Sequence, residues 1–396
     1  MYKGWKVALA GLCINILTGF PYAWSIFASG LSRDLGWTYT QAALPYTVFL
    51  FTYATAMALT GRLQDRFGPR VVIIIGGFLV GIASILSAFL LNPLGITLMW
   101  GVLWGLGVAC CFASVTPAAI KWFPPERKGF VTGIVVFGMG FSAFIMAPLV
   151  HLLLSQQGLQ QTFLLIGIAL LVGVLLLAQL VENPPSGDKD RGQEVKTGGM
   201  KKIAPQSPWE IFRHPQFYML WAMFCLTTGT GVTFVTHMDT IARVHASYEM
   251  GFIIVSLFAF FNASGRIIVG LLSDRIGRER SMTLVFTAMA LIVGGVLLVE
   301  SPLMLAVSVS LLGLSYGGLF SLFPATTASF FGEENFGLFY GLIFTALAAG
   351  GLFPLLAGYL FELQGDFSQA FMVLIAACLA AVALSFVVRK LGTPRL

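Results

Sequence analysis

The sequence predicts an all-α polytopic membrane protein with twelve transmembrane helices in two six-helix, pseudo-symmetric bundles. Three observations favour this class: 57% of the 396 residues are apolar, only 10% are charged, and long apolar runs follow one another from end to end. A soluble domain carries about 25% charged residues, which cover its surface. The 44 glycines suit helices that pack closely within a bilayer.

Twelve segments are long enough to cross a bilayer core of about 30 Å, which takes about 20 helical residues. One long polar stretch, rich in proline, glycine and charge, separates the sixth segment from the seventh. We therefore expect an N-terminal bundle (1–182), a cytoplasmic linker (183–214) and a C-terminal bundle (215–396). The predicted segments are 5–30, 40–62, 70–92, 95–121, 128–155, 160–181, 215–243, 248–273, 281–300, 302–330, 335–362 and 367–388.

The positive charges predict the orientation. With twelve spans and a cytoplasmic N-terminus, all but three of the 23 lysines and arginines fall on the cytoplasmic side. Arg33 and Arg243 fall outside, and Arg266 falls within a helix. The net charge of +6 therefore marks topology and not nucleic-acid binding. We expect a multi-pass, monomeric protein of the inner (cytoplasmic) membrane, with both termini cytoplasmic and the lipid bilayer as its surroundings. The five cysteines lie in apolar segments without metal-ligand spacing, so neither disulfides nor a metal site is expected.

One pattern, G-x-x-x-D-R-x-G, occurs after the second and the eighth segments, the same place in each half. Glycine permits a tight turn, and the aspartate can accept charge-assisted hydrogen bonds from a neighbouring helix end or arginine. The duplication predicts two equivalent gating loops. Their residues are Gly61, Asp65, Arg66 and Gly68 in the first copy, and Gly270, Asp274, Arg275 and Gly277 in the second.

With this repeat the chain resembles the major facilitator superfamily over essentially its full length, and the two loops look like that superfamily's gating motif. The resemblance implies two bundles around a central cavity and transport by alternating access. The sequence contains no HExxH, Walker or CxxC pattern, so we do not expect an enzyme. No cofactor is expected beyond a proton or a counter-anion as the coupling ion.

Arg266 is the strongest candidate for a binding residue. It lies roughly 12 Å from the cytoplasmic end of its segment at about 1.5 Å per residue, and no acidic residue lies at a similar depth. A guanidinium in the bilayer favours an anion, and its planar fork matches a carboxylate. Asn262, one turn earlier on the same face, can add a hydrogen bond. The alternative is that Arg266 extends to the cytoplasmic surface or bonds helix-end carbonyls.

Two further segments narrow the resemblance. The residues at 19–27 (GFPYAWSIF) and 121–129 (KWFPPERKG) look like the oxalate/formate antiporter family, a bacterial relative of the monocarboxylate transporters. In both families a helix-eight arginine binds the substrate carboxylate, and the resemblance implies that role for Arg266. Oxalate transport is associated there with a helix-eleven lysine, and Leu347 stands at the corresponding position.

A single cation suits a single carboxylate, because a dianion would bring an uncompensated charge costing several kcal/mol. The sequence therefore favours a small monocarboxylate such as lactate, pyruvate or formate. An oxalate/formate-type exchanger is the alternative. A drug efflux pump is less favoured, because Gly138 and Gly140 are not followed by the Gly-Pro step that is usual in such pumps.

Proton coupling is expected, but the sequence does not identify the group that carries the proton. Animal monocarboxylate transporters use an aspartate four residues before the arginine and a helix-one lysine; here Asn262 replaces the first, and the second is missing. His237 and Asp239 are the candidates, because histidine titrates in the useful range. The alternatives are that both residues lie at the water interface, or that the substrate carries the proton.

Aromatic residues at helical spacing complete the predicted site. Tyr22 on the first segment and Tyr316 and Phe320 on the tenth can enclose the apolar body of a monocarboxylate, and the tyrosine hydroxyls can reach its oxygens. Ordinary helix packing is the alternative for each of them.

Overall fold

A computed structural model describes residues 2–184, 208–299, 301–332 and 336–391, and every regular element in these ranges is a helix. Most of the predicted linker 183–214 lies outside the described residues. The elements are α1 (Tyr2–Thr18), η1 (Phe20–Ala23), α2 (Trp24–Leu35), α3 (Tyr39–Phe67), α4 (Pro69–Ser87), α5 (Pro93–Ile96), η2 (Thr97–Leu103), α6 (Trp104–Ile120), α7 (Pro125–Ala178), η4 (Pro208–Arg213), α8 (Pro215–Ala246), α9 (Gly251–Ile276), α10 (Arg278–Val296), α11 (Pro302–Phe331), α12 (Phe336–Phe344), α13 (Ala346–Gly350), α14 (Leu352–Gln364) and α15 (Ser368–Leu391).

The number of spans agrees with the sequence once one long helix is divided. Ten stretches of the described residues are long and apolar enough to cross a membrane, and the bent pair Tyr39–Met57 and Leu59–Phe67 makes eleven. One of the ten, Gly129–Ala178, has 50 residues, about 75 Å of helix and far more than a bilayer needs. Gly158 (φ 74°, ψ 178°) breaks it in the middle, so it accounts for two spans and the total is twelve.

The first and the eleventh predicted spans are interrupted where the helical geometry breaks. The first consists of α1, η1 and α2, because Pro21 follows the end of α1. The eleventh consists of α12, α13 and α14, with breaks at Thr345 and Gly351. Such breaks expose backbone groups, which a membrane protein tolerates where the helix faces protein or a cavity.

The two copies of the G-x-x-x-D-R-x-G pattern have the same local structure. Gly68 (φ 82°, ψ 159°) ends α3, and Gly277 (φ 91°, ψ 151°) ends α9, each before a helix that starts at the next residue. Positive φ is accessible to glycine at little cost, which explains why both turns need it. The duplicated motif is therefore duplicated structure, as the predicted pseudo-symmetry requires.

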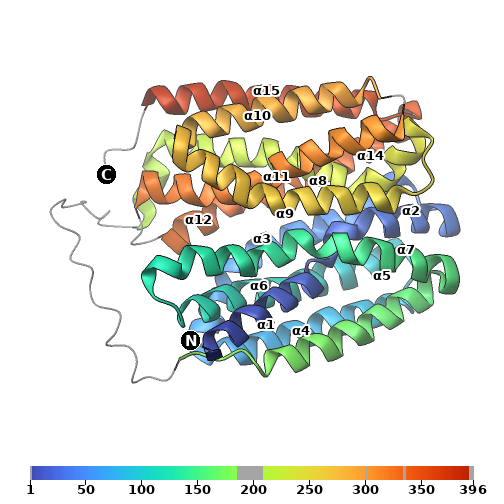
Figure 1. Cartoon of the computed structure of the whole chain (residues 1–396). Coiled ribbons are helices and arrows are strands. Elements are labelled where there is room, and N and C mark those ends of the chain that lie inside the picture. Colours follow the sequence, from blue (N-terminus) through green and yellow to red (C-terminus); the bar gives the residue numbers. More distant parts are fainter. Residues whose placement is uncertain (1, 185–207, 300, 333–335, 392–396) are drawn as a thin grey trace.

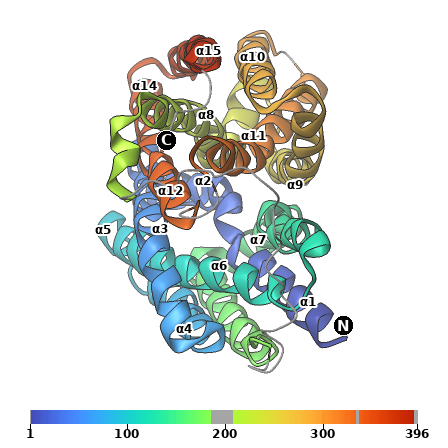
Figure 2. The same ribbon diagram turned by 90° about the vertical axis from the view of Figure 1, so that its left-hand side faces the viewer.

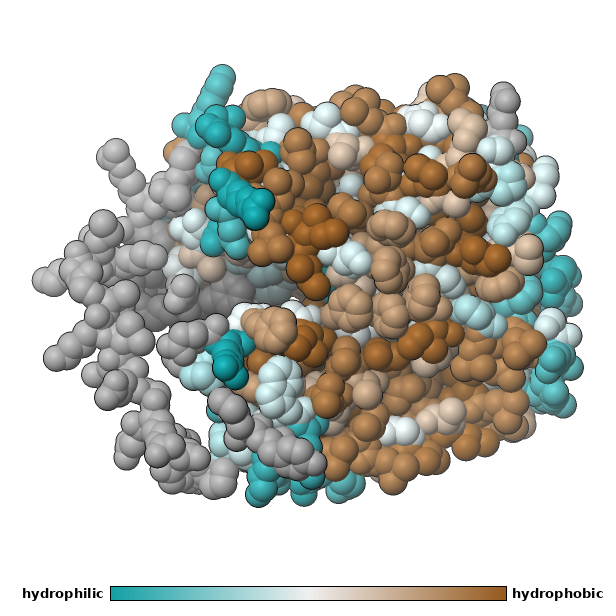
Figure 3. Space-filling model, viewed as in Figure 1, coloured by the Kyte–Doolittle hydropathy of each residue, from teal (hydrophilic) through white to brown (hydrophobic). Residues whose placement is uncertain are grey.

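The helices form two groups side by side, α1 to α7 in one and α8 to α15 in the other (Figure 2). The described ends near both termini and both glycine turns lie at one end of the molecule, which we call the terminal face (Figure 1); the opposite end is the far face. Apolar side chains form a broad belt between them (Figure 3), and many large apolar residues are exposed, Leu291 and Leu298 among them. The domain boundaries and a cytoplasmic location of the terminal face stay predictions.

Candidate substrate cavity

A central cavity of about 820 Å³ lies between the two groups of helices. The first group lines it with residues of η1, α3, α6 and α7, and the second group with residues of α9, α11, α12 and α13. The cavity thus lies at the interface that alternating access would rearrange.

The cavity opens toward the terminal face. Its lining includes Gly61, Gly129, Ala328 and Gly341, each within six residues of the end of its helix at that face. Toward the far face the lining stops earlier, and Tyr46 is seven residues from the start of α3.

Contacts between α3 and the α13–α14 region close the far end. The Thr40 amide donates to Glu362 Oε1 (2.7 Å), and the buried Thr47 hydroxyl donates to the Gly351 carbonyl (2.7 Å). The rings of Tyr39 and Phe361 pack edge to face with centroids 4.3 Å apart. These contacts join residues more than 300 positions apart in the chain, so they hold the two halves together at this end.

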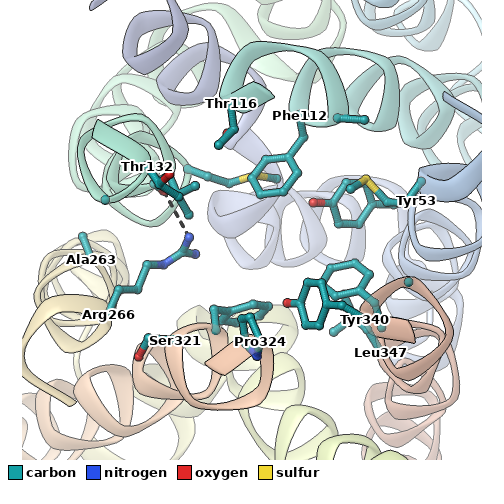
Figure 4. Close-up of a pocket in the computed structure, with 18 of the residues that line it drawn as sticks. Tyr53, Phe112, Thr116, Thr132, Ala263, Arg266, Ser321, Pro324, Tyr340 and Leu347 are labelled. Atoms are coloured by element: carbon teal, nitrogen blue, oxygen red, sulfur yellow. Dashed lines mark hydrogen bonds between the residues drawn. The ribbon is translucent and has the colours of Figure 1, made fainter. Parts of the chain in front are cut away.

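Arg266 is the only charged side chain among the described residues that line the cavity. It comes from α9 and reaches across to α7, where Nη1 donates to the carbonyl of Val136 at 3.1 Å (Figure 4). Within the described ranges it forms no ion pair, and its buried Nε has no hydrogen-bond partner. Gly140 makes room for it, because a Cβ atom there would lie 3.2 Å from Nε. The cavity therefore holds one positive charge that the described protein does not neutralise.

The aromatic face around Arg266 agrees with the predicted one. The guanidinium carbon lies 5.0 Å from the centroid of the Phe320 ring, in a cation–π arrangement. Phe320 in turn packs edge to face on Tyr316 at 5.3 Å, and Tyr22 lines the same cavity from η1. Three of the predicted substrate-binding residues thus lie in the cavity with Arg266.

Three more tyrosines line the cavity and were not expected from the sequence: Tyr46, Tyr53 and Tyr340. The hydroxyls of Tyr53 and Tyr340 point into the space that the guanidinium enters (Figure 4). Tyr46 and Tyr53 are seven residues apart on α3, hence on one face, and this spacing was the available signal. Tyrosine hydroxyls both donate and accept, so they suit an anion that also carries a hydroxyl or keto group.

Asn262 is on the face of α9 next to the cavity but is not part of its lining. Its side chain is fully buried, and both amide atoms lack a hydrogen-bond partner among the described residues. Its Oδ1 lies against Gly317 of α11, where a Cβ atom would be 2.8 Å away. The predicted contact with a carboxylate would require the amide to turn from α11 toward Arg266.

The two predicted proton carriers lie outside the cavity. His237 is buried near the far face, and its Nε2 lies 2.9 Å from the carbonyl oxygen of Pro354. Asp239 is also buried and is paired with Arg243 at 3.0 Å, which in turn pairs with the exposed Glu249. Both residues therefore lie in the closed far-face region.

The charged residues of the two gating loops are exposed. Asp65, Arg66, Asp274 and Arg275 lie at the terminal face and form no ion pair among the described residues. Arg66 stacks on the neighbouring ring of Phe67, with its guanidinium carbon 5.2 Å from the centroid. The loops are thus disengaged on the side where the cavity is open.

Leu347 of α13 lines the cavity, 2% exposed, where the oxalate-transporting relatives are expected to have a lysine. No lysine, histidine or acidic residue belongs to the described lining. Among the described residues, no group of three or more His, Cys, Asp or Glu side chains could hold a metal ion.

Comparison with known proteins identifies membrane transporters as relatives. The family model of the Major Facilitator Superfamily matches residues 7–353. An uncharacterized MFS-type transporter, YhjX of Escherichia coli, is 28% identical over 88% of this chain and 86% of its own. The oxalate:formate antiporter of Oxalobacter formigenes is 25% identical (98% and 92%), and monocarboxylate transporter 12 of Rattus norvegicus is 24% identical (93% and 82%).

Among solved structures, a bacterial homologue of the human lysosomal transporter Spinster, in an inward-facing and unoccupied conformation, matches with a TM-score of 0.68. The match covers 97% of this chain and 95% of that one, at 14% identity. A likeness at this identity shows that the fold is shared.

Proposed function

The chain belongs to the Major Facilitator Superfamily, and on that premise we propose that it carries small monocarboxylates across the membrane with the carboxylate held by Arg266. The protein is a membrane transporter and not an enzyme. One observation carries the substrate proposal: Arg266 is the only charged side chain of the described cavity lining, and it has no described ion-pair partner.

The chemistry of the cavity suits a small carboxylate. A guanidinium binds a carboxylate through two parallel charge-assisted hydrogen bonds, and Nε of Arg266 has no hydrogen-bond partner among the described residues. The face of Phe320 limits where the guanidinium can move, so the fork is held in place. Tyr22 and Tyr316 supply hydroxyls for an oxygen next to the carboxylate, and the apolar remainder of the lining accommodates its carbon body.

A single carboxylate is favoured over two. A dicarboxylate such as oxalate would bring a second negative charge into a cavity whose described lining offers no second cation. Burying an unpaired charge costs several kcal/mol. This supports lactate, pyruvate or formate as the substrate class. Because one relative is an oxalate:formate antiporter, oxalate exchange is the second candidate function for the same site. Drug efflux is the least favoured alternative.

For coupling, we propose first that the carboxylate moves together with a proton. His237 and Asp239 are the proposed side-chain carriers, but both lie outside the cavity, whereas a substrate that carries its own proton needs no side chain.

Anion exchange is the second coupling candidate, and the unpaired charge favours it. An empty cavity that closes at both ends would enclose Arg266 without a counter-charge, whereas a bound carboxylate neutralises it. The loaded protein would then close more readily than the empty one, which couples the movement of one anion to that of another.

The proposed cycle places the terminal face in the cytoplasm of a cell with an inner membrane, with the protein acting as a monomer. In this conformation, the cavity is open at the terminal face and closed at the far face. Substrate bound at Arg266 would reach the other side when the terminal face closes and the far-face contacts separate.

Uptake into proteoliposomes tests the proposal. We would compare labelled lactate, pyruvate, formate and oxalate, with and without an inward proton gradient and with and without anion inside. We expect lactate or pyruvate uptake to fall roughly 30-fold or more in Arg266→Ala, because removing one partner of a buried charge pair costs about 2–5 kcal/mol. Arg266→Lys should retain part of the activity, since it keeps the charge and loses the fork.

The control is Arg213→Ala, which removes an exposed arginine of the terminal face outside the cavity. It should leave uptake unchanged. Uptake that needs internal anion and ignores the proton gradient would select exchange over symport. Oxalate transport without monocarboxylate transport would overturn the proposed substrate, and normal transport by Arg266→Ala would overturn the site.

A further inference from the structure

We propose that a groove between α10 and α15 binds one anionic phospholipid of the leaflet at the terminal face. Its phosphate would lie between Arg280 and Arg389, and an acyl chain would follow the apolar wall beneath them. This site is separate from the central cavity, and it does not depend on the identity of the transported acid.

The fold brings the two arginines together. Arg280 is in the first turn of α10, Arg389 is in the last turn of α15, and the two helices pack on each other with opposite directions (Figure 1). The hydroxyls of Thr283 and Ser385 join the helices one turn below, at 2.8 Å. Both arginines line a groove of about 440 Å³ that runs down from this point.

The charges at the head of the groove favour a phosphate. Arg280 and Arg389 are exposed, and neither has an ion-pair or hydrogen-bond partner among the described residues. The groove has no acidic residue in its described lining. A neighbouring recess shares both arginines but also contains Asp274 and Glu279, so the phosphate is expected on the groove side. Clustered basic residues between helix ends attract anionic head groups.

The wall below the arginines has the length and the exposure of a lipid contact. Leu284 and Leu291 line the groove and are 53% and 72% exposed. The twelve residues from Arg280 to Leu291 span about 16 Å of helix, roughly half the thickness of a bilayer core. Figure 3 shows hydrophilic residues at the terminal face and apolar residues along the middle of the molecule. A free phosphate would use only the head of this groove, whereas a phospholipid uses all of it.

Native mass spectrometry of the full chain in detergent tests this site. We would add dioleoyl phosphatidylglycerol or dioleoyl phosphatidylcholine and measure retention of one lipid. The expected result is retention of phosphatidylglycerol by the wild type, and roughly 30-fold weaker binding in Arg280→Gln/Arg389→Gln, because each arginine contributes about fivefold. Ala288→Phe fills the middle of the groove without a change of charge, and it should also weaken retention.

The matched control is Arg62→Gln/Arg213→Gln, which removes two exposed arginines from the same face outside the groove. It should bind phosphatidylglycerol like the wild type. If both double variants lost phosphatidylglycerol retention equally, the loss would reflect the change in net charge, and this would overturn the site. Displacement of the lipid by inorganic phosphate, with no effect of Ala288→Phe, would also overturn it, because the apolar wall would then have no part. Arg266→Ala should leave lipid retention unchanged.

Discussion

The two ends of the central cavity contain glycines in opposite surroundings. At the far end, a Cβ atom on Gly358 would lie 3.0 Å from the backbone of Tyr39 and Thr40, and one on Gly351 would lie 3.2 Å from Leu50. The glycines that line the open end have no heavy atom within 4 Å of a built Cβ atom. They are Gly61, Gly129, Gly133 and Gly341.

The contrast between the two ends indicates how the molecule would close. Small residues let helix backbones approach within a bilayer, and at the far end they do so between the two halves. At the terminal end the same residue type faces open space, so it has no packing role in this state. We therefore expect these glycines to become contact points when the terminal face closes.

The largest effect is expected from a bulky residue at the open end. Gly133→Val should lower uptake about tenfold or more, because overpacking of the closed interface costs 1–3 kcal/mol. Equilibrium binding of substrate to the open state should change little, and comparing uptake with binding measures this difference. Gly295→Val is the control, since Gly295 also has open space around its Cβ position but lies outside the cavity. Equal losses in the two variants would contradict a gating role.

A smaller effect is expected from the buried hydrogen bond that closes the far end. Thr47→Val keeps the shape and removes the donor to the Gly351 carbonyl, at a cost of about 1 kcal/mol. The population that is open at the far face should rise roughly fivefold. Spin labels at the exposed positions Leu35 and Gln364, without other reactive cysteines, report this as a longer distance. An unchanged distance distribution would mean that this bond does not hold the end closed.

The smallest effect is expected at the rim of the same end. Glu362 is exposed and accepts from the Thr40 amide, so solvent screens the contribution of its charge. Glu362→Gln keeps an acceptor and should shift the same distance distribution by about twofold or less. A shift larger than that of Thr47→Val would mean that the exposed rim, and not the buried hydrogen bond, holds the far end closed.

The sequence predicted the features that depend on special residue chemistry. The repeated Gly and Asp-Arg pattern predicted two equivalent turns, because only glycine adopts their backbone angles readily. The single arginine at depth predicted a place where the protein holds an uncompensated charge. Leu347, which the resemblance aligns with a helix-eleven lysine, lines the cavity.

Other features of the site have only a weak signal in the sequence. Tyr46, Tyr53 and Tyr340 belong to aromatic-rich apolar segments, where packing and cavity lining have the same residue types. Which of these faces the cavity depends on how the two halves meet. The sequence also did not predict the interruption of the eleventh span at Thr345, because no proline stands at that position.

The most direct test of the central claim is the binding of lactate or pyruvate to the purified protein by isothermal titration calorimetry. Wild type should bind, and Arg266→Ala should bind at least roughly 30-fold more weakly or not at all, since a buried charged hydrogen-bond partner is worth about 2–5 kcal/mol. The melting temperature of the empty variant should fall little, because Arg266 makes no ion pair among the described residues and its removal loses only the hydrogen bond to Val136 and the contact with Phe320. Equal affinities in the wild type and in Arg266→Ala would contradict the account.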